Sequence, residues 1–246
     1  MKLESLQDKH KKDKIIFLVG AGSSIKDINL NLLKKYIVMA VNSGIVGVPF
    51  SQYFVSDDIG VSSWSYFKEL SKLKCINLLY KNKLEKYSKH LDSNKTVFYN
   101  HKSWYSPEKK KYNLPDGLQL TSDITKPIVG ARIGMGSCIH LAYAMGGRVI
   151  VLLGNDCQLS KDGKQRRYFW QYWDKLKQPY RISGPKFNEK TQNLGFDQQS
   201  YVNYWNHFCK VNKNLLEKKL RIIDCSNSVL NCFEKKPLEQ VLKEYD

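Results

Sequence analysis

The stretch that decides the fold is IIFLVGAGSSIKDIN, residues 15–29. It opens with five apolar residues, and glycines follow at positions 20 and 22. A short apolar run that ends in glycines is typical of a strand buried in a parallel sheet. Glycines there let the backbone turn sharply and let an anion approach the next helix. The stretch therefore predicts a strand, a tight loop and a helix headed by Ser23 or Ser24, which Asn29 and Asn31 could break.

The loop departs from the fingerprint of dinucleotide-binding folds. Ile25 stands where that fingerprint has its third glycine, and the next apolar stretch, YIVMAVNSG, ends in Asn42 rather than in an acid that holds a ribose. No Gly-Lys-Ser/Thr follows, which excludes a Walker loop. The pattern disfavours NAD and favours a mononucleotide or sugar nucleotide. A tight turn without a ligand is the alternative.

Apolar runs and helical patterns alternate over most of the chain. Further strands are predicted in SQYFVSDD (51–58), CINLLY (75–80), TVFYN (96–100), RVIVLLGND (148–156) and LRIIDCS (220–226). Helices are predicted in VSSWSYFKELSKL (61–73), GSCIHLAYAMGG (136–147), SYVNYWNHFCKVNKNLLEKK (200–219) and PLEQVLKEY (237–245). This order predicts an α/β fold, a Rossmann-like and mostly parallel sheet with helices on both faces.

The domain organisation follows from shifts in composition. Residues 1–14 are expected to form a polar tail or a short helix. Residues 15–246 are expected to form a single nucleotide-binding domain. Two segments interrupt it: a lysine-rich, aromatic, loop-rich insertion at about 81–130, and a basic, lid-like segment at about 158–195.

In parallel sheets of this kind, ligands bind beyond the carboxyl ends of the strands. Asn42 ends one strand, and its amide can donate and accept hydrogen bonds at once, which suits a base or a ribose. Alternatively, Asn42 is a turn residue whose side chain forms a hydrogen bond with the nearby backbone. The strand tips supply these candidate nucleotide ligands: Gly20, Ala21, Gly22, Ser23, Ser24, Asn42, Ser43, Gly154 and Asn155.

Three acids also stand at strand tips: Asp57, Asp58 and Asp156. A carboxylate there can act as a general base or coordinate Mg²⁺ on a diphosphate. Each can also be a helix cap or a solvated charge. The six cysteines show no zinc-ligand spacing, so they are expected to be reduced and no structural metal is predicted.

The net charge of +17 points to an anionic partner, although a biased coding composition would produce it too. Basic residues in the lid-like segment interleave with aromatic ones, a pattern that suits phosphate contacts and base stacking. The alternative is an amphipathic helix. The candidates for phosphate or nucleic-acid contact are Lys161, Lys164, Arg166, Arg167 and Arg181, with Tyr168 as a candidate catalytic residue beside them.

Neither a secretory signal nor an apolar run of the ~20 residues that span a membrane is found in the sequence. A cytoplasmic location is therefore expected.

Three blocks together resemble one superfamily of bacterial sialyltransferases, which also includes phage-type glycosyltransferases and 6-hydroxymethylpterin diphosphokinase-like proteins. The blocks are IIFLVGAGSSIKDI, GSCIHLAYAMGGRVIVLLGND and LRIIDCSNSVLNCF. The resemblance covers both ends of the chain and leaves out the middle. It implies a nucleotide-binding Rossmann-like sheet, with the donor nucleotide held by Gly20, Gly22, Ser24 and Asn42 and by Gly134, Gly136 and Ser137.

The chain also departs from that superfamily. The sialyltransferases use a histidine base after the strand that ends in Gly-x-Asp, and no histidine stands between 140 and 207 here. A carboxylate at Asp57, Asp58 or Asp156 is the natural substitute.

The leading hypothesis is thus a glycosyltransferase that uses a UDP- or CMP-linked sugar. Its acceptor would be a hydroxymethylated base in double-stranded DNA or a surface saccharide. The alternatives are an ATP-Mg²⁺ pyrophosphokinase and a nucleic-acid-binding protein without enzymatic activity.

Overall fold

The computed structural model describes residues 1–100, 105–106, 111–112, 118–129, 134–157, 168–173 and 198–246. Its main strands are β1 (Ile16–Val19), β2 (Ile37–Val41), β3 (Tyr53–Ser56), β4 (Ile76–Tyr80), β5 (Thr96–Tyr99), β8 (Val149–Leu153), β9 (Arg221–Asp224) and β10 (Glu234–Lys235). A separate antiparallel pair joins β6 (Tyr105–Ser106) to β7 (Lys111–Tyr112).

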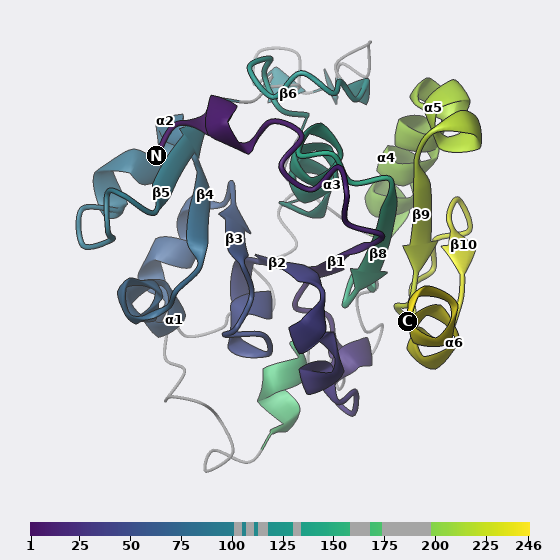
Figure 1. Ribbon diagram of the computed structural model, residues 1–246, viewed down its shortest axis with the longest axis horizontal. Coiled ribbons are helices and arrows are strands. Elements are labelled where there is room, and N and C mark those ends of the chain that lie inside the picture. Colours follow the sequence, from purple (N-terminus) through teal and green to yellow (C-terminus); the bar gives the residue numbers. More distant parts are fainter. Residues whose placement is uncertain (101–104, 107–110, 113–117, 130–133, 158–167, 174–197) are drawn as a thin grey trace.

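Within these residues, eight strands form one sheet in the order β10-β9-β8-β1-β2-β3-β4-β5 (Figure 1). Every neighbouring pair in it is parallel. The predicted Rossmann-like α/β fold is confirmed. The strand predicted at 96–100 becomes β5, the edge of the main sheet, although it lies inside the segment expected to be an insertion.

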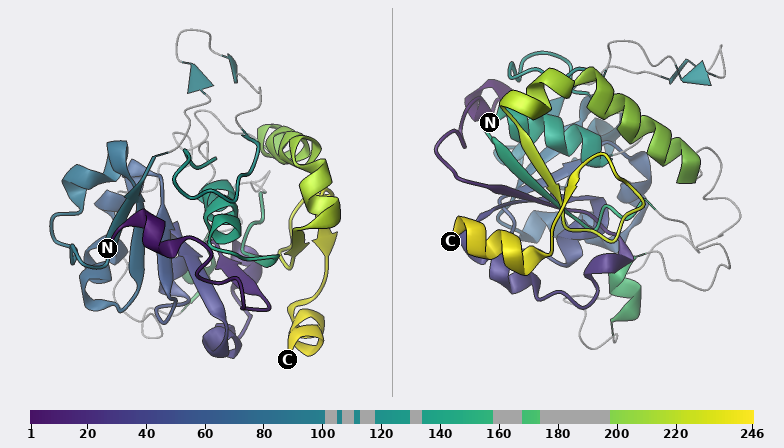
Figure 2. Two further views of the ribbon diagram at one scale, coloured as in Figure 1. Left: turned by 45° about the horizontal axis from the view of Figure 1, so that its top comes forward. Right: turned by 90° about the vertical axis from the view of Figure 1, so that its right-hand side faces the viewer.

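Helices cover both faces of the sheet, as the two views in Figure 2 show. One face carries α3 (Gly134–Ala144), α4 (Gln198–Val211), α5 (Lys213–Lys218) and the 3-10 helix η1 (Leu3–Leu6). The other carries the 3-10 helices η2 (Ser23–Ile25), η3 (Leu30–Lys35), η4 (Asn42–Val46) and η9 (Phe169–Tyr172), together with α1 (Ser65–Glu69) and α6 (Leu238–Tyr245). The remaining short helices are η5 (Ile59–Ser63), η6 (Leu70–Lys72), α2 (Lys81–Leu84) and η7 (Glu85–Tyr87).

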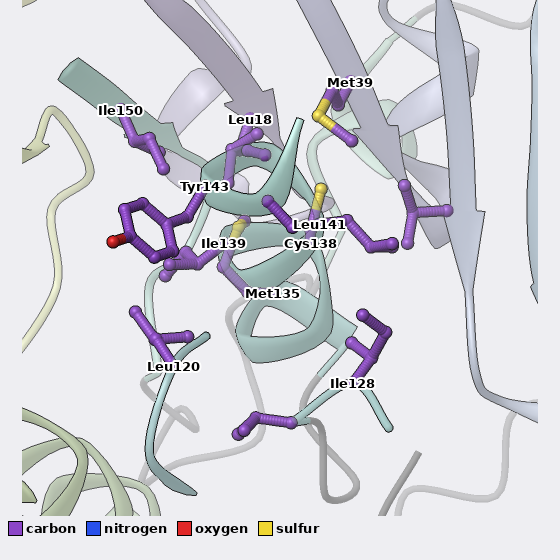
Figure 3. Close-up of a cluster of buried hydrophobic side chains, with 14 of the residues drawn as sticks. Leu18, Met39, Leu120, Ile128, Met135, Cys138, Ile139, Leu141, Tyr143 and Ile150 are labelled. Atoms are coloured by element: carbon purple, nitrogen blue, oxygen red, sulfur yellow. The ribbon is translucent and has the colours of Figure 1, made fainter. Parts of the chain in front are cut away.

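The two-sided cover explains why the strands are apolar throughout rather than alternating with polar residues. In β1, Ile16 and Leu18 join the core under α3, whereas Phe17 and Val19 join the core on the opposite face. All four side chains are fully buried. Figure 3 shows the first of these cores, in which Met135, Cys138 and Ile139 of α3 lie beside Leu18 and Ile150.

Two predicted helices are broken by asparagine side chains that bond to the backbone. After the glycine loop, the Asn29 side chain accepts a hydrogen bond from the Asn31 N–H at 3.2 Å, and the segment forms η2 and η3 instead of one helix. The 200–219 helix divides into α4 and α5 at Asn212, whose side chain is hydrogen-bonded to Leu118 and Leu120. Asparagine competes with helical hydrogen bonds in this way because its side chain resembles a peptide group.

The first residues of the chain belong to the folded body. Leu6 is fully buried, and His10 is 5% exposed. The two ring nitrogens of His10 lie 2.7 Å from an Asp13 carboxylate oxygen and 2.7 Å from the Tyr53 hydroxyl. This segment therefore packs on the sheet through β3. No helix in the described ranges is both long and apolar enough to cross a membrane.

Candidate functional site

The strand order places a topological switch point at the carboxyl end of β1. From β1, the chain continues to β2 on one side, while β8 pairs with β1 on the other. Connections that diverge from one strand leave a crevice at its carboxyl end, where ligands bind in open parallel sheets. The sequence-predicted strand tips of β1, β2 and β8 therefore meet at the expected place.

The glycine loop lies directly against the end of β8. The Gly20 N–H donates to the Leu153 carbonyl at 2.7 Å, and the Gly22 N–H donates to the Gly154 carbonyl at 2.9 Å. A Cβ on Gly20 would lie 2.6 Å from the Gly154 carbonyl oxygen. Gly154 itself has a φ of +65°, a conformation that favours glycine. The glycines thus allow the backbone of the loop after β1 to lie in close contact with the backbone at the end of β8.

Asp156 occupies the head of the helix that follows this loop. Its carboxylate accepts hydrogen bonds from the Ser24 N–H at 2.9 Å, from the Ser24 hydroxyl and from the Ser23 hydroxyl at 3.3 Å. Burial raises the pKa of Asp156, while the hydrogen bonds from Ser24 act in the opposite direction. In dinucleotide-binding folds, a phosphate lies at the corresponding helix head. Here a side chain of the protein already fills that place.

Two buried amides at the neighbouring strand tips have an atom without a hydrogen-bond partner. Asn42, directly after β2, has a φ of +51°, and its Oδ1 is buried and unpaired. Asn155, directly after β8, is 7% exposed, and its Nδ2 is buried and unpaired. The rest of Asn155 is held in place, since its N–H donates to the Ser226 hydroxyl at 2.8 Å and its Oδ1 accepts from the Cys157 thiol at 3.6 Å. Unpaired buried polar atoms and a left-handed non-glycine residue are features that cluster at ligand sites.

Asp57 links β3 to the start of α3. It is 4% exposed, and its carboxylate accepts a hydrogen bond from the Ser137 hydroxyl at 2.8 Å. A Cβ on Gly134 would lie 3.4 Å from the Asp57 carboxylate and 3.5 Å from the Asn42 amide nitrogen. The nearest atom to that Cβ would be Val41 Cγ1, at only 3.1 Å, so the absence of a side chain at Gly134 lets these two polar groups pack closely against the start of α3. Ser43 is buried beside Asn42 in η4.

Two tyrosines that sequence reasoning missed lie close to Asp57. Tyr99 of β5 donates to the Ser56 carbonyl at 3.3 Å, and the Tyr204 hydroxyl lies 2.3 Å from where a Cβ on Gly136 would be. Burial raises the pKa of both phenols, and the negative charge of Asp57 adds to the effect. The sequence offers no signal that separates them from ordinary core aromatics. Asp57 thus lies in a buried cluster of polar side chains from β3, β5, α3 and α4.

Asp58 has a different role from its neighbour. Its carboxylate accepts a hydrogen bond from the Gly60 N–H at 2.8 Å and caps η5, with the side chain exposed. Of the roles considered for Asp58, the structure shows the helix cap. In the described part of the chain, no three His, Cys, Asp or Glu side chains gather as a metal-binding group.

Tyr168 lies beside the glycine loop. It pairs through its backbone with Gly22, and the Phe169 N–H donates to the Ala21 carbonyl at 3.2 Å. The Tyr168 ring stacks on Trp170, with centroids 5.2 Å apart, and meets Trp64 edge to face at 6.4 Å. The described piece of the lid-like segment is thus fixed against the candidate site. The basic candidates of that segment lie outside the described residues: Lys161, Lys164, Arg166, Arg167 and Arg181.

Comparison with known proteins gives a fold relationship. A glycosyltransferase named MAf, from Magnetospirillum magneticum AMB-1, aligns over 92% of this chain with a TM-score of 0.53 and 9% sequence identity. This fold occurs in a known glycosyltransferase. The chain spans 34% of the length of that protein.

The sialyltransferase CstII from Campylobacter jejuni also aligns, in two structures. In complex with the substrate analogue CMP-3FNeuAc, it covers 91% of this chain and 86% of its own, with a TM-score of 0.46 and 14% identity. In complex with a trisaccharide acceptor and CMP, it covers 90% of this chain and 85% of its own, with a TM-score of 0.42 and 15% identity. No family model and no curated protein matches the chain. The resemblance expected from the sequence is confirmed as a likeness of structure.

Proposed function

We propose that this protein is a glycosyltransferase that uses a nucleotide-linked sugar as donor. The observation that carries the proposal is the pair of unpaired buried amide atoms, Asn42 Oδ1 and Asn155 Nδ2, on either side of the switch point. One is an acceptor and the other a donor. β2 and β8 are two strand spacings apart, roughly 10 Å, which is comparable to the length of a nucleoside monophosphate.

The chemistry of the site favours a nucleoside over a bare phosphate. Asp156 occupies the helix head after the glycine loop, and Asp57 lies at the first turn of α3, so carboxylates are present where a phosphate would otherwise bind. Carboxylates and amide oxygens accept hydrogen bonds from ribose hydroxyls and from base N–H groups. The proposed donor is a UDP- or CMP-linked sugar, with ribose and base on Asn42 and Asn155. The basic residues outside the described ranges stay candidates for contact with its phosphate: Lys161, Lys164, Arg166, Arg167 and Arg181.

Asp57 is the proposed general base. Its carboxylate and the Asn42 amide both lie close to Gly134, so the two groups face the same part of the site. In the transfer step, an acceptor hydroxyl oxygen forms a bond to the anomeric carbon while the bond from that carbon to the phosphate oxygen breaks. The hydroxyl proton goes to Asp57, and the electron pair of the broken bond goes to the leaving nucleotide. Asp156 holds the glycine loop, and Tyr168 is proposed to line the side of the site nearest that loop.

The proposed acceptor is a polyanion. The net charge of +17 supports DNA that contains hydroxymethylated bases, and a surface saccharide is the alternative. A DNA acceptor requires a flipped base to reach the sheet edge. Pyrophosphokinase chemistry has less support, because Asp57, Asp58 and Asp156 have separate structural partners rather than forming one Mg²⁺-binding set.

A donor and acceptor panel tests the proposal. The protein is mixed with UDP- and CMP-linked sugars, or with ATP-Mg²⁺, and its thermal unfolding is followed. The same donors are then incubated with modified DNA, unmodified DNA and oligosaccharides, and the products are identified by mass spectrometry. Stabilisation by a nucleotide-sugar and a sugar mass on one acceptor are expected. Stabilisation by ATP-Mg²⁺ alone would support the pyrophosphokinase, and DNA binding without any nucleotide effect would support a binding protein.

Replacing Asn42 by glycine tests the site itself. Glycine accepts the left-handed backbone and removes the unpaired oxygen, so the free protein should unfold at the same or a higher temperature. Binding of the donor nucleotide should weaken by about 1–3 kcal/mol, roughly 5- to 150-fold, as measured by calorimetry. Asp8→Gly is the matched control, because Asp8 is exposed and has a φ of +52°. Equal donor affinity in the two variants would remove Asn42 from the site.

A further inference from the structure

Two half-buried thiols meet behind the strand tips, on segments 23 residues apart. Cys209 lies in α4, and Cys232 lies in the connection between β9 and β10. The Cys209 thiol donates a hydrogen bond to the Cys232 carbonyl oxygen at 3.6 Å, so the two cysteine residues are in direct contact. No part of the nucleotide site described above uses either side chain.

Aromatic side chains hold these two segments together. Phe233, next to Cys232, meets Trp205 and Phe208 of α4 with ring centroids 5.4 Å and 6.4 Å apart. Trp205 and Phe208 are both fully buried. The approach of the two cysteine residues is therefore fixed by the core.

The pKa shifts of the thiols distinguish this pair from the other four cysteines. Burial raises the pKa of Cys157 and Cys225 to about 12 and also raises that of Cys75 and Cys138. The neighbouring Cys209 thiol lowers the pKa of Cys232, and Cys232 in turn raises the pKa of Cys209. A thiolate is the reactive form of cysteine, and a neighbouring thiol can complete a disulfide.

We propose that Cys209 and Cys232 are a modification site, at which a hydroperoxide converts the two thiols to a reversible disulfide. The Cys232 sulfur attacks one peroxide oxygen, the O–O bond breaks, and Cys232 becomes a sulfenic acid with release of water or an alcohol. The Cys209 sulfur then attacks the Cys232 sulfur, and the sulfenic oxygen leaves as water with the Cys209 proton. Both sulfurs are oxidised by one electron each, and the peroxide is reduced by two.

The bond would tether α4 to the β9–β10 connection. Tyr204 of the same helix lies against Gly136, and Ser226 of the same connection holds the Asn155 backbone. The tether would therefore link two segments that support the candidate nucleotide site. The proposal does not depend on what binds there.

Thiol mapping of the full chain tests the proposal. The folded protein is treated with one equivalent of hydrogen peroxide, alkylated under denaturing conditions and analysed as intact protein and as peptides. The expected result is a loss of two alkylated thiols from the six, a peptide that joins Cys209 to Cys232, and full recovery after dithiothreitol. Cys225→Ser, a half-buried control at the end of β9, should still form the cross-link.

Two further readouts decide the outcome. Cys209→Ser and Cys232→Ser should each abolish the cross-linked peptide, and in the untreated protein Cys232 should be alkylated at least about tenfold faster than Cys225. Retention of all six alkylated thiols, a disulfide between another pair, or oxidation of Cys232 to a sulfinic acid while Cys209 stays free would overturn the proposal. The measurements on the unsubstituted protein remain decisive even if a serine variant fails to fold.

Discussion

At the scale of single residues, the site contains polar groups in two different states. Asp156 is satisfied by two serines, whereas Asn42 and Asn155 each keep an atom unpaired. The first state stabilises a loop, and the second is available to a ligand. The sequence places all three residues at strand tips, but it cannot separate these roles. From the sequence alone, Asp156 is interpreted as a candidate catalytic carboxylate, because its contacts with Ser23 and Ser24 are seen only in the structure.

The raised pKa of Asp156 predicts a pH dependence of stability. Because its pKa in the folded protein lies above the ordinary value of 3.8, the folded state binds more protons than the unfolded chain between those two values. Its contribution to the free energy of unfolding therefore rises as the pH falls through that window. Asp156→Asn lacks the charge, so it should be at least as stable as the parent at pH 7, and this advantage should shrink toward pH 4. Urea unfolding at several pH values measures it, and an advantage that grows with acidity would contradict the assignment.

At the scale of elements, the start of α3 depends on the absence of two side chains. Gly134 lets Asp57 and Asn42 pack closely against the helix start, and Gly136 lets α4 approach through Tyr204. The sequence predicts this helix from its small residues and apolar pattern. It does not predict α4 as the neighbour, because contact between elements far apart in the chain leaves no local signal. The break at Asn29 is one that the sequence suggests, whereas the break at Asn212 differs from prediction because side-chain hydrogen bonds to the backbone override apolar spacing.

Gly136→Ala should show how tightly α3 and α4 are packed. Alanine favours a helix over glycine by about 1 kcal/mol, so a loss of stability would come from the contact with Tyr204. A Cβ there would lie 2.3 Å from the Tyr204 hydroxyl oxygen and 3.4 Å from the ring carbon that carries it. We expect the free energy of unfolding to fall by about 1–3 kcal/mol.

The companion substitution Tyr204→Phe tests the cause. Removing the hydroxyl leaves the ring carbon at a tolerable distance from the new methyl group, so the double variant should recover part of the loss. A double-mutant cycle in chemical denaturation should give a favourable coupling of about 1 kcal/mol or more. Strictly additive effects would place the strain elsewhere.

At the scale of the whole molecule, the chain is one sheet with a core on each face. The sequence predicts this well because strands buried on both sides are continuous apolar runs, which are the clearest of local patterns. It predicts the N-terminal segment less well. Residues 1–14 are mostly polar, yet Leu6 is fully buried and His10 lies between Asp13 and Tyr53. Three apolar side chains, Met1, Leu3 and Leu6, in a stretch of 14 mostly polar residues are too weak a pattern to reveal this docking.

Leu6→Ala measures how far the N-terminal segment belongs to the cooperative unit. Deleting a fully buried leucine side chain typically lowers the free energy of unfolding by about 2–5 kcal/mol. Leu32→Ala is the matched control, because Leu32 is 48% exposed, and it should change stability by no more than about 0.5 kcal/mol. Thermal and urea unfolding compare the two variants. Equal, small effects would show that the segment unfolds separately from the sheet.

The pairing of β1 with β8 also bears on how the chain is made. β1 ends at Val19 and β8 begins at Val149, so about 130 residues must leave the ribosome before the central strand acquires its second neighbour. At synthesis rates of about 5–20 residues per second, this takes roughly 7–26 seconds. Throughout that interval, an apolar strand has one open edge, which invites pairing with other nascent chains. The order of strands that creates the crevice thus leaves the growing polypeptide open to aggregation until β8 has been made.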